Sequence, residues 1–163
     1  MTLKFLTRTA VLLALTLAFQ MFKLPQLFTG PAVNTMLFVS GGVVGIGGGV
    51  LIGALTPWIA FVNGILPAPL APAIPFIMLG NAALVAVFVS VKRLNNMAAI
   101  ILAAVIKFLI LSTAVRMIIN VPPKIATMLQ LPQLYTALAG GVISFVILKM
   151  LEKPLGLNKQ VER

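Results

Sequence analysis

The sequence consists mainly of apolar runs of membrane-spanning length, separated by short polar breaks. Of its 163 residues, 61% are hydrophobic and only 9% are charged, whereas about a quarter of the residues in a soluble domain are charged. A transmembrane helix needs about 20 predominantly apolar residues, so five or six spans with short loops would occupy the whole chain. We therefore expect an all-α integral membrane protein with a single transmembrane domain over residues 1–163, whose soluble work is done by partners.

The apolar runs favour six spans, with five as the alternative. The expected spans are residues 9–22, 32–44, 48–65, 76–91, 97–119 and 133–151. The break between the second and third spans falls at residues 45–49, because each of the three consecutive glycines there weakens a helix by about 1 kcal/mol relative to alanine. One long span through these glycines would give five spans and place the chain ends on opposite sides of the membrane.

The basic residues agree with six spans and two cytoplasmic termini. Cytoplasmic loops carry an excess of lysine and arginine. The inner side would then hold Lys4, Arg8, Lys92, Arg93, Lys149, Lys153, Lys159 and Arg163, and the outer side only Lys23 and Lys124. The net charge of +10 is dispersed among apolar segments rather than collected on a soluble face, so we expect no nucleic-acid partner.

The polar inventory argues against an enzyme. Cysteine, histidine and aspartate are absent, and the only acids are Glu152 and Glu162 near the C-terminus. Hydrolases and transferases need an activated nucleophile or a general base, so we expect no catalytic activity, no metal site and no cofactor. Carriers driven by protons or sodium also rely on intramembrane carboxylates or histidines, so the energy for any transport would come from elsewhere.

The segment from Gly41 to Asn81 combines close packing with irregular backbone. Small residues spaced four apart allow helices to approach closely in lipid, and here they are Gly41, Gly45, Gly49 and Gly53. The prolines of residues 66–75 prevent a continuous helix and predict an outer loop. Since irregular backbone at membrane depth is tolerated only beside protein or a cavity, this segment is interpreted as one wall of a small-molecule site.

Two cations in the fifth expected span are candidate ligand contacts. Lys107 near the middle of the span costs about 2.5–3.5 kcal/mol to insert, and the spans contain no acid to pair with it. It would meet an anionic ligand group, a lipid phosphate or backbone carbonyls, or else extend to the surface at a subunit interface. Arg116 lies half a helical circumference away, beside Asn120, and either faces an outer pocket or anchors a headgroup.

Amides and aromatic residues complete the candidate site. Asn34, Asn63 and Asn81 lie near the outer ends of three expected spans, where they would bind ligand or tie loops together. Trp58 and Tyr135 would stack on a ring or belong to an interfacial belt. The candidate substrate-binding residues are Asn34, Trp58, Asn63, Asn81, Lys107, Arg116, Asn120 and Tyr135.

Alanines in the first span form a possible contact surface. Ala10, Ala14 and Ala18 follow one another at intervals of four residues and therefore share one helix face. A flat face of this kind suits a helical partner, although alanine is also common in apolar helices.

Taken together, six short spans, the Ala10-xxx-Ala14-xxx-Ala18 face and the segment GVVGIGGGVLIGALTPWIAFVNG with its proline-rich loop resemble the substrate-binding S components of energy-coupling factor (ECF) transporters. The resemblance implies an S-component-like bundle in a prokaryotic cell membrane, which captures a vitamin or related micronutrient from outside. It also implies docking, through the alanine face, on a transmembrane T component that works with two cytoplasmic ATPases, and a pocket formed by the loops at 24–31, 66–75 and 120–132.

The substrate and some alternatives stay open. No folate-type or biotin-type signature is present, while Lys107, Arg116 and the missing carboxylates favour a neutral or anionic substrate over a cationic one. The main alternative is a small oligomeric membrane scaffold that uses its glycine and alanine faces for self-association. A stand-alone facilitator or channel is a third.

Overall fold

The computed structural model describes residues 2–22 and 24–156, and over these it contains helices and loops only. Lys23, Lys159 and Arg163 lie outside the described residues. In chain order the elements are α1 (Leu3–Met21), α2 (Gln26–Val62), the 3₁₀ helix η1 (Ala68–Ala73), α3 (Ile74–Val91), α4 (Asn96–Thr113), the π-helical turn η2 (Ala114–Ile118), α5 (Pro123–Met128) and α6 (Leu131–Leu155).

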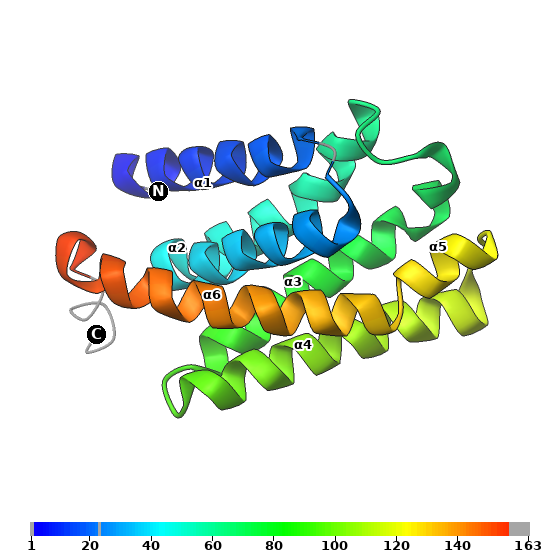
Figure 1. Cartoon of the computed structure of the whole chain (residues 1–163). Helices are drawn as coiled ribbons and strands as arrows, with labels where there is room; N and C mark the ends of the chain where they lie inside the picture. The colour runs from blue at the N-terminus through cyan, green and yellow to red at the C-terminus, as the bar shows by residue number, and fades with distance from the viewer. Residues whose placement is uncertain (1, 23, 157–163) are drawn as a thin grey trace.

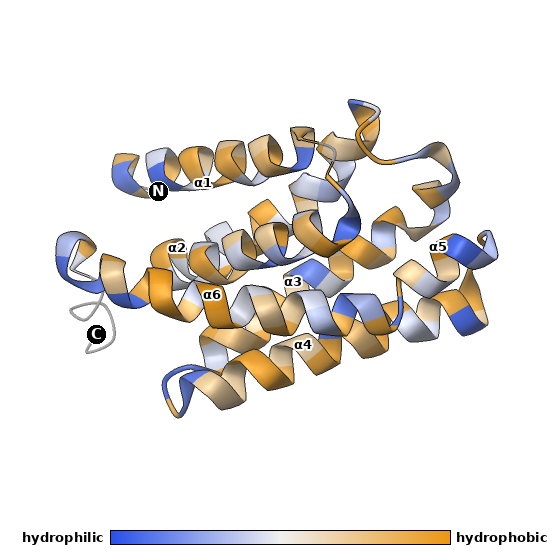
Figure 2. Ribbon diagram, in the orientation of Figure 1, coloured by the Kyte–Doolittle hydropathy of each residue, from blue (hydrophilic) through white to orange (hydrophobic). Residues whose placement is uncertain are grey.

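Five helical stretches of the described chain are long and apolar enough to cross a membrane. They are Leu3–Met21, Gln26–Val62, Ala68–Val91, Asn96–Ile118 and Pro123–Leu155. Figure 2 shows apolar residues along the middle of the helices and hydrophilic residues gathered toward their ends. The all-α prediction is therefore confirmed, and the helices indicate a membrane protein. The expected count of six spans is not confirmed by this number, because residues 26–62 count as one stretch.

The longest stretch, α2, reverses direction at Gly45. Gly45 has φ 75° and ψ −170°, a combination that is essentially confined to glycine. A Cβ added to Gly49 would lie 3.1 Å from Cα of Gly41, whereas eight residues of straight helix cover about 12 Å. The two halves, residues 26–44 and 46–62, therefore lie side by side and antiparallel (Figure 1). The sequence predicts a break within residues 45–49. In the structure only Gly45 has non-helical dihedral angles, and residues 46–49 are helical.

The bundle has two ends that hold different segments (Figure 1). The end that we call the bend end holds the reversal of α2, the turn between α3 and α4, the start of α1 and the end of α6. The opposite end, called the loop end, holds η1, η2 and α5.

The core is organised around α2, which packs against α1, α3 and α6. Leu37 and Ile52, one from each half of α2, are fully buried. Phe38 meets Phe88 of α3 edge to face, with 4.9 Å between the ring centroids. Close backbone approach depends on glycine, since a Cβ added to Gly140 in α6 would lie only 2.7 Å from the carbonyl oxygen of Pro31.

Three expected loops contain more helix than predicted. Helix α2 begins at Gln26 within the expected loop 24–31, α3 begins at Ile74 within 66–75, and α5 occupies part of 120–132. Prolines stand in the first turns of α3, α5 and α6, where the missing N–H has no intrahelical partner to lose. These prolines therefore lie at helix starts, and not only at the helix breaks that the sequence predicts for them.

Candidate ligand-binding site

The site is built around Lys107, which α4 carries into the interior of the bundle. Only 3% of the residue is exposed, and its ammonium Nζ donates a hydrogen bond to Oδ1 of Asn34 over 2.7 Å. The α3 backbone leaves room for this side chain at Gly80, where an added Cβ would lie 3.3 Å from Cγ of Lys107. A neutral amide oxygen is thus the hydrogen-bond partner of this buried cation.

Asn34 is oriented by contacts within α2 and with α6. Its Nδ2 donates to the carbonyl oxygen of Gly30 over 2.9 Å and to Oγ1 of Thr136 over 3.4 Å. These bonds use the N–H groups of the amide and leave Oδ1 to accept from Lys107. Gly140 allows α6 to approach closely enough for the Thr136 contact, because an added Cβ would lie 2.8 Å from Cβ of Asn34.

Two buried amide oxygens nearby have no hydrogen-bond partner among the described residues. They are Oδ1 of Asn81 and Oε1 of Gln20, in side chains only 3% and 9% exposed. The Nδ2 of Asn81 donates to the carbonyl oxygen of Gly53 over 3.1 Å, which fixes the orientation of this amide. An unpaired buried acceptor costs about 1–3 kcal/mol, so both oxygens call for a donor that the described chain does not supply.

These polar groups share one cavity of about 350 Å³ at the loop end of the bundle. Its lining residues are Gln20, Leu24, Gln26, Thr29, Gly30, Val33, Asn34, Pro57, Gly64, Ile65, Leu66, Pro67, Leu70, Ile77, Asn81, Lys107, Ile125, Met128, Leu129 and Gln133. Each of the three expected loop regions contributes to this lining. Gln26 Nε2 also donates to the carbonyl oxygen of Met128 over 3.0 Å, which ties the start of α2 to α5.

The cavity can recognise a small molecule with both donor and acceptor groups. An ammonium carries three N–H donors, of which Lys107 gives one to Asn34, so the others can meet ligand acceptors. Gln20 and Asn81, whose amide oxygens lack a partner, stand in the same wall as possible acceptors for ligand donors. Apolar side chains form most of the remaining wall. No carboxylate lines this cavity, so the described wall offers no counter-charge for a cationic ligand.

Three other candidate residues lie outside this cavity. Trp58 and Tyr135 are 53% and 64% exposed, positions that suit an interfacial aromatic belt. Asn63 is exposed and donates from Nδ2 to the carbonyl oxygen of Ile59, one turn earlier in its own helix, over 2.8 Å. The structure therefore does not bring these three side chains together with Lys107.

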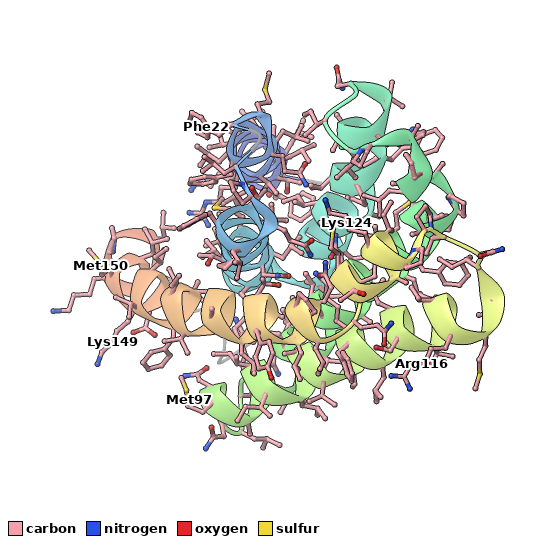
Figure 3. The ribbon with its side chains drawn as sticks, turned by 45° about the vertical axis from the view of Figure 1, so that its right-hand side comes forward. Phe22, Met97, Arg116, Lys124, Lys149 and Met150 are labelled. Atoms are coloured by element: carbon pink, nitrogen blue, oxygen red, sulfur yellow. The ribbon has the colours of Figure 1, made fainter. Side chains whose placement is uncertain are left out.

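Arg116 and Asn120 are also exposed and absent from the cavity wall. Nε and Nη2 of Arg116 donate to Oε1 of Gln130 over 3.3 and 3.1 Å, a contact that links η2 to the residue before α6. Figure 3 shows Arg116 near the end of α4, away from α1. Lys107 points into the bundle and Arg116 outward, in agreement with their spacing of nine residues.

Four polar lining residues were not among the candidates expected from the sequence: Gln20, Gln26, Thr29 and Gln133. Gln20 had a detectable signal, because Thr9, Thr16 and Gln20 fall on one face of an apolar helix, and all three are buried. Such a polar face points toward protein rather than lipid. The other three lie in segments expected to be loops or at the edge of a span, where polar residues are unremarkable.

The alanine face of α1 is free within the described chain. Ala10, Ala14 and Ala18 are all exposed, because the opposite face of α1, with Leu12 and Thr16, packs inward. The exposed alanines leave a flat surface along the outside of α1.

No family model matches this chain, and no curated protein or solved structure matches it either.

Proposed function

We propose that this chain is the substrate-capture (S) subunit of an ECF-type importer for a vitamin or related micronutrient. The observation that carries the proposal is the loop-end cavity, whose wall contains Lys107 together with Gln20 and Asn81, the two side chains whose buried amide oxygens lack a partner. Its volume of about 350 Å³ falls at the lower end of the usual range for small-molecule pockets. The resemblance of the sequence to S components supplies the transport role.

In this proposal the chain crosses a prokaryotic cell membrane six times. The reversal at Gly45 makes the two halves of α2 separate spans, since a straight helix of 37 residues would be about 55 Å long and the hydrocarbon core is about 30 Å thick. The bend end is cytoplasmic, because it carries the basic residues of the α3–α4 turn, of the start of α1 and of the last turns of α6. The loop end, with the cavity, faces outside.

The proposed substrate is a small neutral or anionic molecule. It presents N–H or O–H groups to the oxygens of Gln20 and Asn81, and an acceptor or anionic group to Lys107. The apolar wall takes the rest of the molecule, and its mixture of polar and apolar surface is typical of small-molecule sites. A permanently cationic substrate is disfavoured, because it would bury a second positive charge beside Lys107.

The proposed partners are a transmembrane T component and two cytoplasmic ATPases, which would drive transport. The exposed alanine face of α1 is the proposed docking surface for the T component. Replacing Ala14→Trp should block co-purification of that partner by filling the flat face, while ligand binding stays unchanged because Ala14 does not line the cavity. Normal co-purification would contradict this docking surface.

The binding site is tested by identifying the ligand and then removing one acceptor. Mass spectrometry of small molecules released from the denatured protein should find a stoichiometric vitamin-like compound, and thermal-shift screening of vitamins and their precursors provides a second route. Asn81→Leu should then weaken binding about 5- to 150-fold, since a ligand donor buried without its acceptor costs about 1–3 kcal/mol. Equal affinity of the wild type and this variant would refute the site.

Asn63→Leu is the matched control for this experiment. It removes the same chemical group from an exposed residue whose amide bonds only within its own helix, so affinity should not change. A protein that stays empty after both the release and the screening experiments would favour the scaffold function instead.

A further inference from the structure

A second cavity, of about 480 Å³, lies at the bend end of the bundle. Its polar wall contains Lys92 and Arg93 from the turn after α3, Lys149 from α6, and a single carboxylate, Glu152. Three cationic side chains thus face one anionic side chain around the same space. Figure 3 shows Lys149 at the same end of the bundle as Met97, which lies in the first turn of α4.

Apart from Asn96, the rest of this cavity is apolar. Val89 of α3 and Phe145 and Leu148 of α6 are half-buried and form part of its wall, with Gly41 and Gly42 of α2 beside them. An occupant that fits both parts has a negatively charged group and an apolar tail. A free inorganic anion would leave the apolar part of the cavity without a partner.

Lys92 is a cation placed between a buried ring and a second cation. The residue is half-buried, and its Nζ lies 5.8 Å from the ring centroid of Phe88. Burial, and then the neighbouring positive charge of Arg93, lower the pKa of Lys92 below its usual value. An anion in the cavity would relieve the repulsion between these adjacent cations.

We propose that the bend-end cavity binds one acidic phospholipid, with the phosphate among Lys92, Arg93 and Lys149 and an acyl chain along Val89, Phe145 and Leu148. The cavity lies where the apolar spans end and the basic residues begin, which is the level of a phospholipid headgroup. Basic pockets between transmembrane helices bind acidic headgroups in this way. This site is independent of the ligand bound at the opposite end.

The test compares lipid binding by native mass spectrometry of the detergent-purified protein. Dioleoylphosphatidylglycerol should bind with a stoichiometry of one, and dioleoylphosphatidylcholine should bind at least tenfold more weakly. Arg93→Gln/Lys149→Gln should weaken phosphatidylglycerol binding about 30-fold, since each basic residue near the headgroup contributes about a factor of five. Both replaced side chains are exposed, so the variant should fold normally.

A control with the same change in net charge is Lys4→Gln/Lys124→Gln, because both lysines are exposed and neither lines the cavity. This control should bind phosphatidylglycerol as the wild type does. An equal loss in both double variants would overturn the proposal in favour of general surface attraction. Equal binding of the two lipids would overturn it as well. The proposal would also be overturned if glycerol phosphate, at the same concentration as phosphatidylglycerol, displaced the lipid, because the apolar wall would then contribute nothing to binding.

Discussion

The buried contact between Lys107 and Asn34 predicts an unequal response to removal of its two partners. Asn34→Leu keeps the side chain close to its original size but leaves the ammonium of Lys107, which is 3% exposed, without its 2.7 Å acceptor. A hydrogen bond to a charged group contributes about 1.5–3 kcal/mol, and an orphaned buried charge costs more than an orphaned neutral group. We expect Asn34→Leu to destabilise the protein by about 3 kcal/mol.

Lys107→Met removes the charge itself, so its effect should be smaller. The variant leaves Oδ1 of Asn34 without a partner, which costs about 1–3 kcal/mol, but it also removes the cost of burying an ammonium. The double variant Asn34→Leu/Lys107→Met leaves neither group unpaired. It should therefore be about 2 kcal/mol more stable than Asn34→Leu alone, although it carries one more substitution.

The assay is a double-mutant cycle on the ligand-free protein in detergent. Reversible unfolding of the wild type, both single variants and the double variant gives the coupling energy between the two sites. The order that we expect places Asn34→Leu as the least stable of the four. Additive effects, or a double variant less stable than Asn34→Leu, would show that the two side chains do not interact in the folded protein and would refute the reasoning.

Two glycines provide further predictions about the frame that holds this site. Gly45→Ala should destabilise the protein by about 1–3 kcal/mol, because its φ of 75° and ψ of −170° lie in a region that side chains avoid. Gly140→Ala should cost about 1–3 kcal/mol through overpacking, since the added Cβ would meet backbone atoms of Pro31 and Thr35 at 2.7 and 2.8 Å. Thermal unfolding measures the stability of both variants, and Gly47→Ala is the control. Gly47 is an exposed helical glycine, and an added Cβ would have no neighbour within 4 Å. Alanine at this position should therefore be neutral or raise stability by up to about 1 kcal/mol. Wild-type stability of Gly45→Ala would contradict the bend, and wild-type stability of Gly140→Ala would contradict the close packing of α6 on α2.

Sequence reasoning located the helices well because hydropathy alone decides where a chain can cross a membrane. It placed the break in α2 within five residues, since consecutive glycines weaken a helix whatever surrounds them. It could not predict at which glycine the helix reverses, because Gly45, Gly47, Gly48 and Gly49 have the same intrinsic helix propensity. Their differences come from their neighbours: Gly49 meets Val85 and Gly41, whereas Gly45 and Gly47 meet nothing within 4 Å.

The candidate site shows the same division between composition and packing. Lys107, Asn34 and Asn81 stood out because a polar side chain in an apolar span needs a partner, and the structure brings all three to one cavity. Trp58 and Tyr135 stood out for their chemistry alone, and they lie on the surface. An aromatic side chain is compatible with either a pocket or a lipid interface. Which of the two it contacts depends on the helix face that carries it, and the packing of the neighbouring helices determines whether that face is buried.

The bend and the cavity are geometrically linked. Asn34 precedes Gly45 by eleven residues and Gly53 follows it by eight, so along antiparallel helical halves they lie about 16 and 12 Å from the bend. The reversal therefore returns Gly53, which holds Asn81 through its carbonyl oxygen, to nearly the depth of Asn34, which accepts from Lys107. In a straight α2 the two residues would be almost 30 Å apart, so Asn81, held at Gly53, could not line the same cavity as Asn34. One glycine conformation at the bend end thus determines which amides meet at the other end of the bundle.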